Sequence, residues 1–185
     1  MGEQHKKHNR REHLNDFHLN VAGEYVYDGA LYACQNDDAK QRRSKRAVWG
    51  MAAILTVAVA AGGCIPAPGM QNCFYVLLPY LGEFLGAASV VWALAKLGTD
   101  WSTVREYNYK KSVAVLPMRT AVTAVFSLLG IVCELIFFFV NDHAGQTFFA
   151  LLYILLKLTA LLSALVLRAE IMQAEWDKLP KKDNS

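Results

Sequence analysis

Four long apolar stretches, separated by short polar segments, divide the chain. They cover about 47–65, 74–97, 119–140 and 147–168. In a helix with a rise of ~1.5 Å per residue, about 20 residues cross the ~30 Å hydrocarbon core of a bilayer. The stretches are too long and too continuously apolar for helices of a soluble bundle. The pattern therefore predicts an all-α integral membrane protein, a four-helix transmembrane bundle built from two tandem helical hairpins, with its membrane domain at 47–168.

Two of these stretches carry one ionisable residue each near the middle, Glu83 in the second and Lys157 in the fourth. A charge at the centre of a spanning helix costs about 2.5–3.5 kcal/mol even on insertion scales, so it is normally paired. Aligning the two stretches from Phe74 and Phe148 places Glu83 on Lys157. We therefore expect an intramembrane charge pair at matching depth.

An internal repeat is the second pattern in the chain. Glu24–Tyr27 and Glu106–Tyr109 share the pattern Glu-Tyr-x-Tyr, and each precedes basic residues, a span, a short turn and another span. Both halves would enter the membrane from the same side, so the repeat would be parallel, with its axis along the membrane normal. Such an axis brings equivalent positions to equal depth, which suits a contact between Glu83 and Lys157.

The third stretch has one polar or small face. Thr123, Ser127, Gly130 and Glu134 are spaced i, i+4, i+7 and i+11, which places them on one side of a helix. Facing lipid, this side would leave Glu134 without a polar partner, so we expect it to face the bundle interior. Glu134 would then be a third member of the charge network, nearer the outer surface. The alternative is an interfacial carboxyl that reaches toward the lipid headgroups.

The two Tyr-rich segments are expected outside the membrane, as short β-hairpins or, alternatively, as interfacial helix. Segment 24–33 contains Asp28-Gly29 between β-prone residues, and Asp-Gly suits turn positions that need positive φ. In segment 106–113, Tyr107 and Tyr109 alternate with polar neighbours, which also favours a strand.

Basic residues are distributed unevenly. The turns 66–72 and 141–146 contain no Lys or Arg, whereas the arm 1–46, the loop 98–118 and the tail 169–185 are rich in them. By the positive-inside rule, both termini and the middle loop are cytoplasmic. The cluster Lys40–Arg46 directly precedes a span, which favours contact with anionic headgroups over nucleic acid. The chain's size and short loops suggest a bacterial cytoplasmic membrane.

Two sets of residues are candidates for metal or redox chemistry. The histidines of the arm do not share one helical face, which favours a solvated arm over a metal site; they are His5, His8, His13 and His18. Cys64 and Cys73 flank the first outer turn and would form a disulfide if the turn faces an oxidising space. The alternative is two free thiols. We expect no cofactor and no metal.

Three classes of function are compatible with this pattern. The first is a non-enzymatic accessory or interaction module, held in register by the Glu83–Lys157 pair, that binds a protein partner. The second is an oligomeric ion- or proton-coupled transporter or channel that uses Glu83, Glu134 and Lys157. An enzyme would need a nucleophile, for which Cys133 is the nearest candidate, and no histidine lies within any span. We favour the first class.

Overall fold

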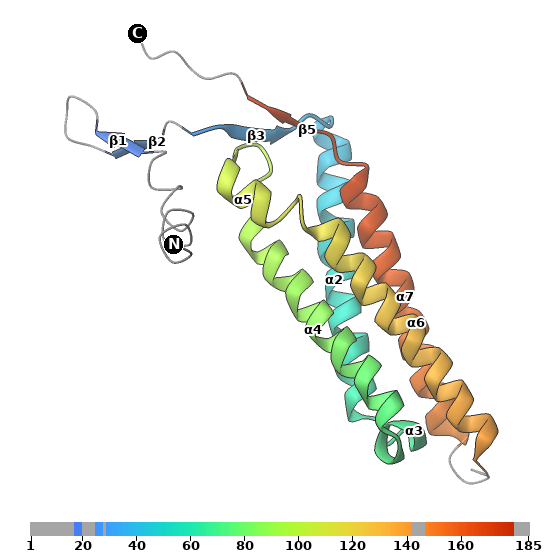
Figure 1. The fold of residues 1–185 in the computed structure, drawn as a ribbon. Helices are drawn as coiled ribbons and strands as arrows, with labels where there is room; N and C mark the ends of the chain where they lie inside the picture. Colours follow the sequence, from blue (N-terminus) through green and yellow to red (C-terminus); the bar gives the residue numbers. More distant parts are fainter. Residues whose placement is uncertain (1–16, 20–24, 28, 142–146, 180–185) are drawn as a thin grey trace, which may run out of the picture.

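The computed structural model is an elongated bundle of four long helices with a small sheet across one end (Figure 1). The structure describes residues 17–19, 25–27, 29–141 and 147–179. The long helices are α2 (Asp38–Cys64), α4 (Phe74–Leu97), α6 (Leu116–Val140) and α7 (Thr147–Met172). Successive helices run in opposite directions, so the bundle has an up-down-up-down topology (Figure 1).

The outer surface of the bundle is apolar over the length of the four helices. Large side chains lie exposed on every helix, including Val57 on α2, Leu85 on α4, Phe139 on α6 and Leu162 on α7. All four helices are long and apolar enough to cross a membrane. A soluble protein rarely exposes so large an apolar surface. The prediction of a four-helix transmembrane bundle is therefore confirmed.

Two of the helices are longer than the hydrophobic pattern predicts. Helix α4 has the predicted bounds, but α2 begins at Asp38 rather than near Ala47, so the basic cluster Lys40–Arg46 is helical. Helix α7 continues to Met172, four residues beyond the predicted span. Between α2 and α4, the predicted turn contains the short helix α3 (Pro68–Asn72), whose first residue is a proline, as is common at helix starts.

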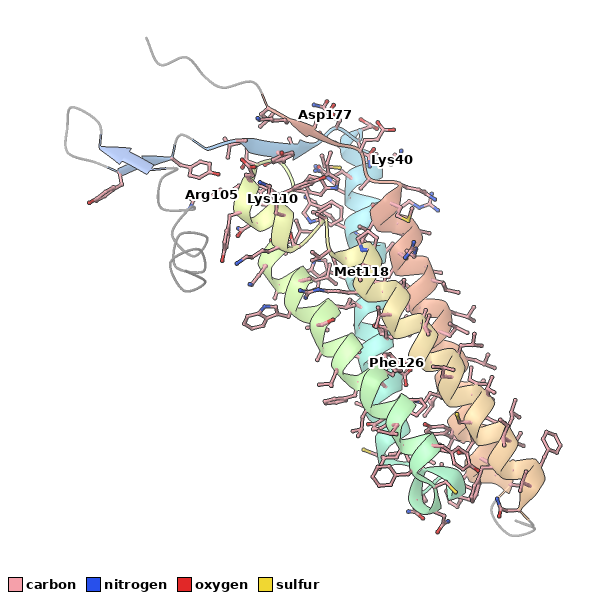
Figure 2. The ribbon with its side chains drawn as sticks, viewed as in Figure 1. Lys40, Arg105, Lys110, Met118, Phe126 and Asp177 are labelled. Carbon is pink, nitrogen blue, oxygen red and sulfur yellow. The ribbon has the colours of Figure 1, made fainter. Side chains whose placement is uncertain are left out.

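Helix α6 packs between α4 and α7, and α2 packs on α7 and, less extensively, on α4. The approach of α4 to α6 depends on two glycines: a Cβ at Gly82 would overlap the Phe126 ring, and one at Gly86 would overlap the Thr123 hydroxyl. Figure 2 labels Phe126 about half-way along the bundle. Small residues of this kind let transmembrane helices pack closely.

Two arginines tie the helices together near the sheet end. Arg119 on α6 donates a hydrogen bond to the Ser89 carbonyl on α4 (2.6 Å). Arg168 on α7 donates one to the Pro117 carbonyl on α6 (2.6 Å). Because α6 takes part in both bonds, these contacts join three helices at one level of the bundle.

A cap of short strands and aromatic side chains closes this end. Strand β3 (Leu31–Cys34) lies between β4 (Val104–Arg105) and β5 (Trp176–Lys178), and both pairings are antiparallel. Trp101 is 1 % exposed and belongs to the cluster of buried residues that extends into the bundle. Its carbonyl accepts a hydrogen bond from the Cys34 N–H (3.1 Å). The cap thus joins three segments that are far apart in sequence.

The predicted hairpin at 24–33 is wrong in its pairing, although both of its arms are strands. Strand β2 (Tyr25–Tyr27) pairs with β1 (Phe17–Leu19) in a separate sheet. Strand β3 has β4 on one side and β5 on the other, so neither of its edges is free for β2. Asp28 and the arm up to residue 16, with His5, His8 and His13, lie outside the described residues.

Of the two alternatives for 106–113, the structure has the helix and not the strands, because this segment forms helix α5 (Glu106–Lys111). Lys110 pairs with Glu106 one turn earlier (2.6 Å), a spacing that stabilises a helix. This hydrogen bond from Lys110 holds the pKa of the Glu106 carboxyl below its usual value. Glu106 in the first turn and two lysines in the last also suit the helix dipole.

The internal repeat is only partly reflected in the structure. In the ring of helices, α2 lies opposite α6 and α4 lies opposite α7, as an axis along the bundle would require. However, α6 and α7 pack together much more extensively than α2 and α4. The two Glu-Tyr-x-Tyr segments also differ, since β2 is a strand and α5 a helix. The motif match therefore does not extend to local structure.

Candidate functional site: a buried charge pair and a separate buried carboxyl

Glu83 and Lys157 form an ion pair inside the bundle. The Lys157 Nζ donates to the Glu83 Oε2, and the Ser127 hydroxyl donates to the Glu83 Oε1 (2.6 Å). Glu83 and Ser127 are completely buried, and Lys157 is 2 % exposed. One residue comes from each of α4, α6 and α7, so the cluster links three of the four spans.

The surroundings of Lys157 are shaped to hold its ammonium group. The Tyr80 ring lies 4.6 Å from Nζ and the Tyr153 ring 5.0 Å from it, and aromatic faces attract cations at such distances. On α6, the position of a Cβ at Gly130 would be 3.6 Å from the Lys157 Cε. The missing side chain at Gly130 thus leaves room for the lysine stem between α6 and α7.

Each charged group of this cluster has a partner of opposite polarity. Both Glu83 oxygens accept a hydrogen bond, one from an ammonium and one from a hydroxyl. Such compensation is what allows a buried ion pair to exist in a low-dielectric environment. Removing either charged partner would leave the other buried and uncompensated. The ion pair is therefore a specific contact between α4 and α7.

The polar face of α6 lies inside the bundle. Thr123, Ser127, Gly130 and Glu134 are all buried. The Thr123 hydroxyl donates to the Arg119 carbonyl one turn earlier (2.9 Å), and its side chain packs against Gly86 of α4. Thr123 therefore belongs to a tight helix contact, and Ser127 belongs to the ion-pair cluster.

Glu134 is buried apart from the ion pair. Its Oε1 is 3.4 Å from the backbone nitrogen of Gly69, in α3, and its Oε2 has no hydrogen-bond partner in the described part of the chain. A Cβ at Gly69 would overlap this carboxylate. In the described part of the chain, no ion pair joins Glu134 to Lys157. The expectation that Glu134 joins Glu83 and Lys157 in one charge network is therefore wrong. Helix α3 folds against α6, and its Gly69 N–H contacts Glu134 instead.

Tyr153 is a further buried polar residue, on α7 one turn before Lys157. It is completely buried, and its hydroxyl has no hydrogen-bond partner among the described residues. An unpaired buried hydroxyl is uncommon in folded proteins. The half of the bundle away from the cap thus contains two polar atoms, on Tyr153 and Glu134, without a partner among the described residues.

Cys64 and Cys73 stand at the two ends of the connection that contains α3. Both are free cysteines, Cys64 exposed and Cys73 half-buried. The structure therefore has the second of the two alternatives drawn from the sequence. Cys133, next to Glu134 on α6, is also free and half-buried.

A scan against protein-family models finds no match to this chain, and searches of curated proteins and of solved structures find none either. Functional inference therefore depends on the geometry of the bundle and its cap.

We expect Glu134→Gln to change the free energy of unfolding by less than about 1 kcal/mol. The glutamine oxygen can still accept from the Gly69 N–H, and no ion pair is lost. Thermal unfolding in a mild detergent would measure the change. A loss as large as that for Glu83→Gln would contradict the separation of Glu134 from the buried pair.

Proposed function

We propose that this small polytopic membrane protein is a non-enzymatic accessory or interaction module. The observation that carries the proposal is the buried pair of Glu83 and Lys157, in which Ser127 satisfies the remaining carboxylate oxygen. Groups that hold each other in this way fix how helices pack. A proton or ion relay needs groups that exchange partners, whereas both Glu83 oxygens already accept hydrogen bonds within the bundle.

The proposed docking surface is the free edge of the cap sheet. Strand β5 lies at one edge of the sheet formed by β4, β3 and β5 in the described part of the chain. The other edge strand, β4, is only two residues long and leads directly into α5. An exposed strand edge is a template for pairing with a strand from another protein. We therefore assign the partner as a protein that contributes an extended segment.

The backbone N–H and carbonyl groups of β5 alternate between facing β3 and facing away from it. Those that face away are available to a strand of the partner. On β5's inner side, the Leu179 N–H donates to the Leu31 carbonyl (2.8 Å). In an antiparallel ladder, the residues that bond to one neighbour alternate with residues that face away from it. Since Asp177 is in register with Ala33, the N–H and carbonyl of Trp176 and Lys178 point away from β3.

The orientation of the chain is also part of the proposal. Lys40, Arg105 and Lys110 all lie at the cap end (Figure 2). At the other end, the described residues of the first turn, from Ile65 to Cys73, include no lysine or arginine. By the positive-inside rule, the cap and both termini would be cytoplasmic, with the protein integral to the cytoplasmic membrane of a bacterium. A strand donor would then be a cytoplasmic segment of the partner.

Lys178→Pro tests the docking edge. Proline removes the N–H that points outward and leaves the inward bonds of Asp177 and Leu179 in place. We expect co-purification of the partner, from the native membrane in mild detergent, to fall about tenfold, the effect of ~1.4 kcal/mol. The matched control is Lys178→Ala, which removes the charge and keeps the N–H. Equal yields of partner from the two variants, with unfolding temperatures equal to that of the wild type, would exclude this edge as the docking surface.

An oligomeric ion- or proton-coupled transporter or channel is the second candidate, and Glu134 is the observation that favours it. This carboxyl is completely buried, and one of its oxygens has no hydrogen-bond partner among the residues that the structure describes. Carboxylates inside helix bundles serve as relays in pumps and transporters. If this function holds, Glu134→Gln would abolish ion flux in liposomes while the protein stays folded. Unchanged flux would remove Glu134 from the path.

A further inference from the structure

The first turns of α2 carry a hollow lined mainly by arginines. It has a volume of about 530 Å³, and its walls are Asp38, Ala39, Arg42, Arg43 and Arg46. Arg46 stands three residues after Arg43 and four after Arg42, so it lies beside both on the helix surface, and all three side chains line the hollow. In the described part of the chain, no ion pair occupies any of the three. The hollow therefore has an excess of positive charge over its single acid, Asp38.

A second, smaller hollow adjoins the first on the side of α7. Its volume is about 240 Å³, and it is lined by Asn36, Lys40, Arg43, Ser44, Glu170 and Gln173. Arg43 lines both hollows. The acid in the second hollow, Glu170, accepts a hydrogen bond from Ser44 (3.0 Å). Lys40, which lies at the cap end of α2 (Figure 2), adds a further positive charge at the rim.

The arginine hollow lies at the level where lipid headgroups would be. Helix α2 has 27 residues, and about 20 are enough to cross the hydrocarbon core, so its first two turns extend beyond it. Trp49 follows one turn after the arginines and is partly exposed, which is typical of an aromatic residue at the membrane interface. The charges therefore face the polar boundary of the bilayer.

Below the arginines, the same side of α2 offers a shallow path for an acyl chain. Gly50, Ala53 and Val57 follow Arg46 at helical spacings, and all three are exposed on the outer surface. A Cβ at Gly50 would have no atom of the described residues within 4 Å. A small residue directly under the arginines leaves space beside the helix, and the positions beneath it are apolar.

We infer that this part of α2 is a binding site for an acidic phospholipid. Arg42, Arg43 and Arg46 bind the phosphate, since guanidinium groups donate paired hydrogen bonds to phosphate oxygens. One acyl chain lies along Gly50 and Ala53. The apolar path below the charges is what distinguishes a lipid from a free phosphate ion, which would use only the arginines. This inference is independent of the docking edge on β5.

The test is lipid retention measured by native mass spectrometry on the full-length protein in mild detergent. Phosphatidylglycerol and phosphatidylcholine are added in equal amounts, and the bound fraction of each is compared. We expect phosphatidylglycerol to be retained about tenfold over phosphatidylcholine, because only the former has net negative charge. Inorganic phosphate at millimolar concentration should not displace it.

Two triple variants with the same change in net charge provide the control. Arg42→Gln/Arg43→Gln/Arg46→Gln should abolish the preference for phosphatidylglycerol. Lys96→Gln/Lys110→Gln/Lys111→Gln removes three charges from α4 and α5 at the same end of the protein and should keep it. Equal losses in both variants would mean that only diffuse electrostatic attraction is present, which would overturn the site.

A single substitution tests the acyl path without any change in charge. Gly50→Leu fills the space under the arginines and should weaken retention of phosphatidylglycerol several-fold. It also keeps the test decisive if the triple arginine variant fails to fold. Unchanged retention in Gly50→Leu, or displacement of the lipid by inorganic phosphate, would show an anion site without a lipid path and would contradict the inference.

Discussion

Glu83→Gln should lower the free energy of unfolding by about 3–5 kcal/mol, the usual effect of breaking a buried ion pair by removing one partner. The glutamine keeps the shape of the side chain and can still accept from Ser127, but it leaves the Lys157 ammonium buried without a negative partner. Lys157→Met should have a comparable effect, because it leaves the Glu83 carboxylate uncompensated. This is the largest effect that we expect from a single substitution in the bundle.

The double variant Glu83→Gln/Lys157→Met should recover most of the loss. It removes both buried charges, and replacing a buried pair by uncharged groups is often nearly neutral. A double-mutant cycle on unfolding in mild detergent measures the coupling between the two positions. Glu134→Gln is the matched control, since it neutralises a buried carboxyl that has no ion-pair partner among the described residues. Additive losses in the cycle would disprove the pairing.

Gly86→Leu should lower the free energy of unfolding by about 1–3 kcal/mol, as overpacking of a tight core does. A Cβ at this position would overlap the Thr123 hydroxyl and lie 3.3 Å from the Thr123 Cα, which belongs to the α6 backbone. A side chain could rotate away, but a helix backbone can give way only if α4 and α6 separate. Such a separation would also pull Glu83 away from Ser127, one turn along the same interface.

The control for Gly86→Leu is the same substitution at Gly50. Gly50 also lies within a spanning helix, but a Cβ there would meet no atom within 4 Å in the described part of the chain. Both variants change glycine to leucine in a helix, so they share the same change in helix propensity. Gly50→Leu should therefore leave the unfolding temperature unchanged or slightly raised. If both variants lost stability to the same extent, the close contact between α4 and α6 would not be its cause.

The spans and the charge pair could be predicted because each follows from the residues of one segment. An apolar run of sufficient length forms a spanning helix, and a charge within such a run is unfavourable without a partner. A run of about 20 apolar residues is sufficient to predict a spanning helix. An isolated charge within such a run needs a partner, and Lys157 was the residue of opposite charge at the depth of Glu83. The position of Ser127 on the buried face of α6 could also be read from helical spacing. The hydrogen bond from Ser127 to Glu83 could not be predicted in this way, because the rotation of α6 against α4 depends on the packing at Gly82 and Gly86.

The cap could not be predicted because it depends on pairing between distant short segments. Strand β3 has four residues, and its partners β4 and β5 have two and three. Segments of that length carry little hydrophobic pattern, and their register is set by tertiary context. The helix α5 was predictable in principle, because Glu106 and Lys110 are spaced for a helical pair. The Tyr alternation favoured the wrong interpretation.

The position of Glu134 could not be derived from its own helix. Helical spacing places it on the buried face of α6, which is where the structure has it. Its contact with Gly69 exists because α3 folds back against α6 at the end of the bundle. The sequence pattern predicts only a proline- and glycine-containing turn there, and such a turn does not indicate which helix it will contact.

The most direct test of the proposed function is the mass and composition of the complex extracted from its own membrane in mild detergent. An accessory module predicts a second protein in stoichiometric amount, retained by Lys178→Ala and lost from Lys178→Pro. A homo-oligomer without any other protein, whose ion flux in liposomes is abolished by Glu134→Gln, would contradict the account and establish the transport function instead.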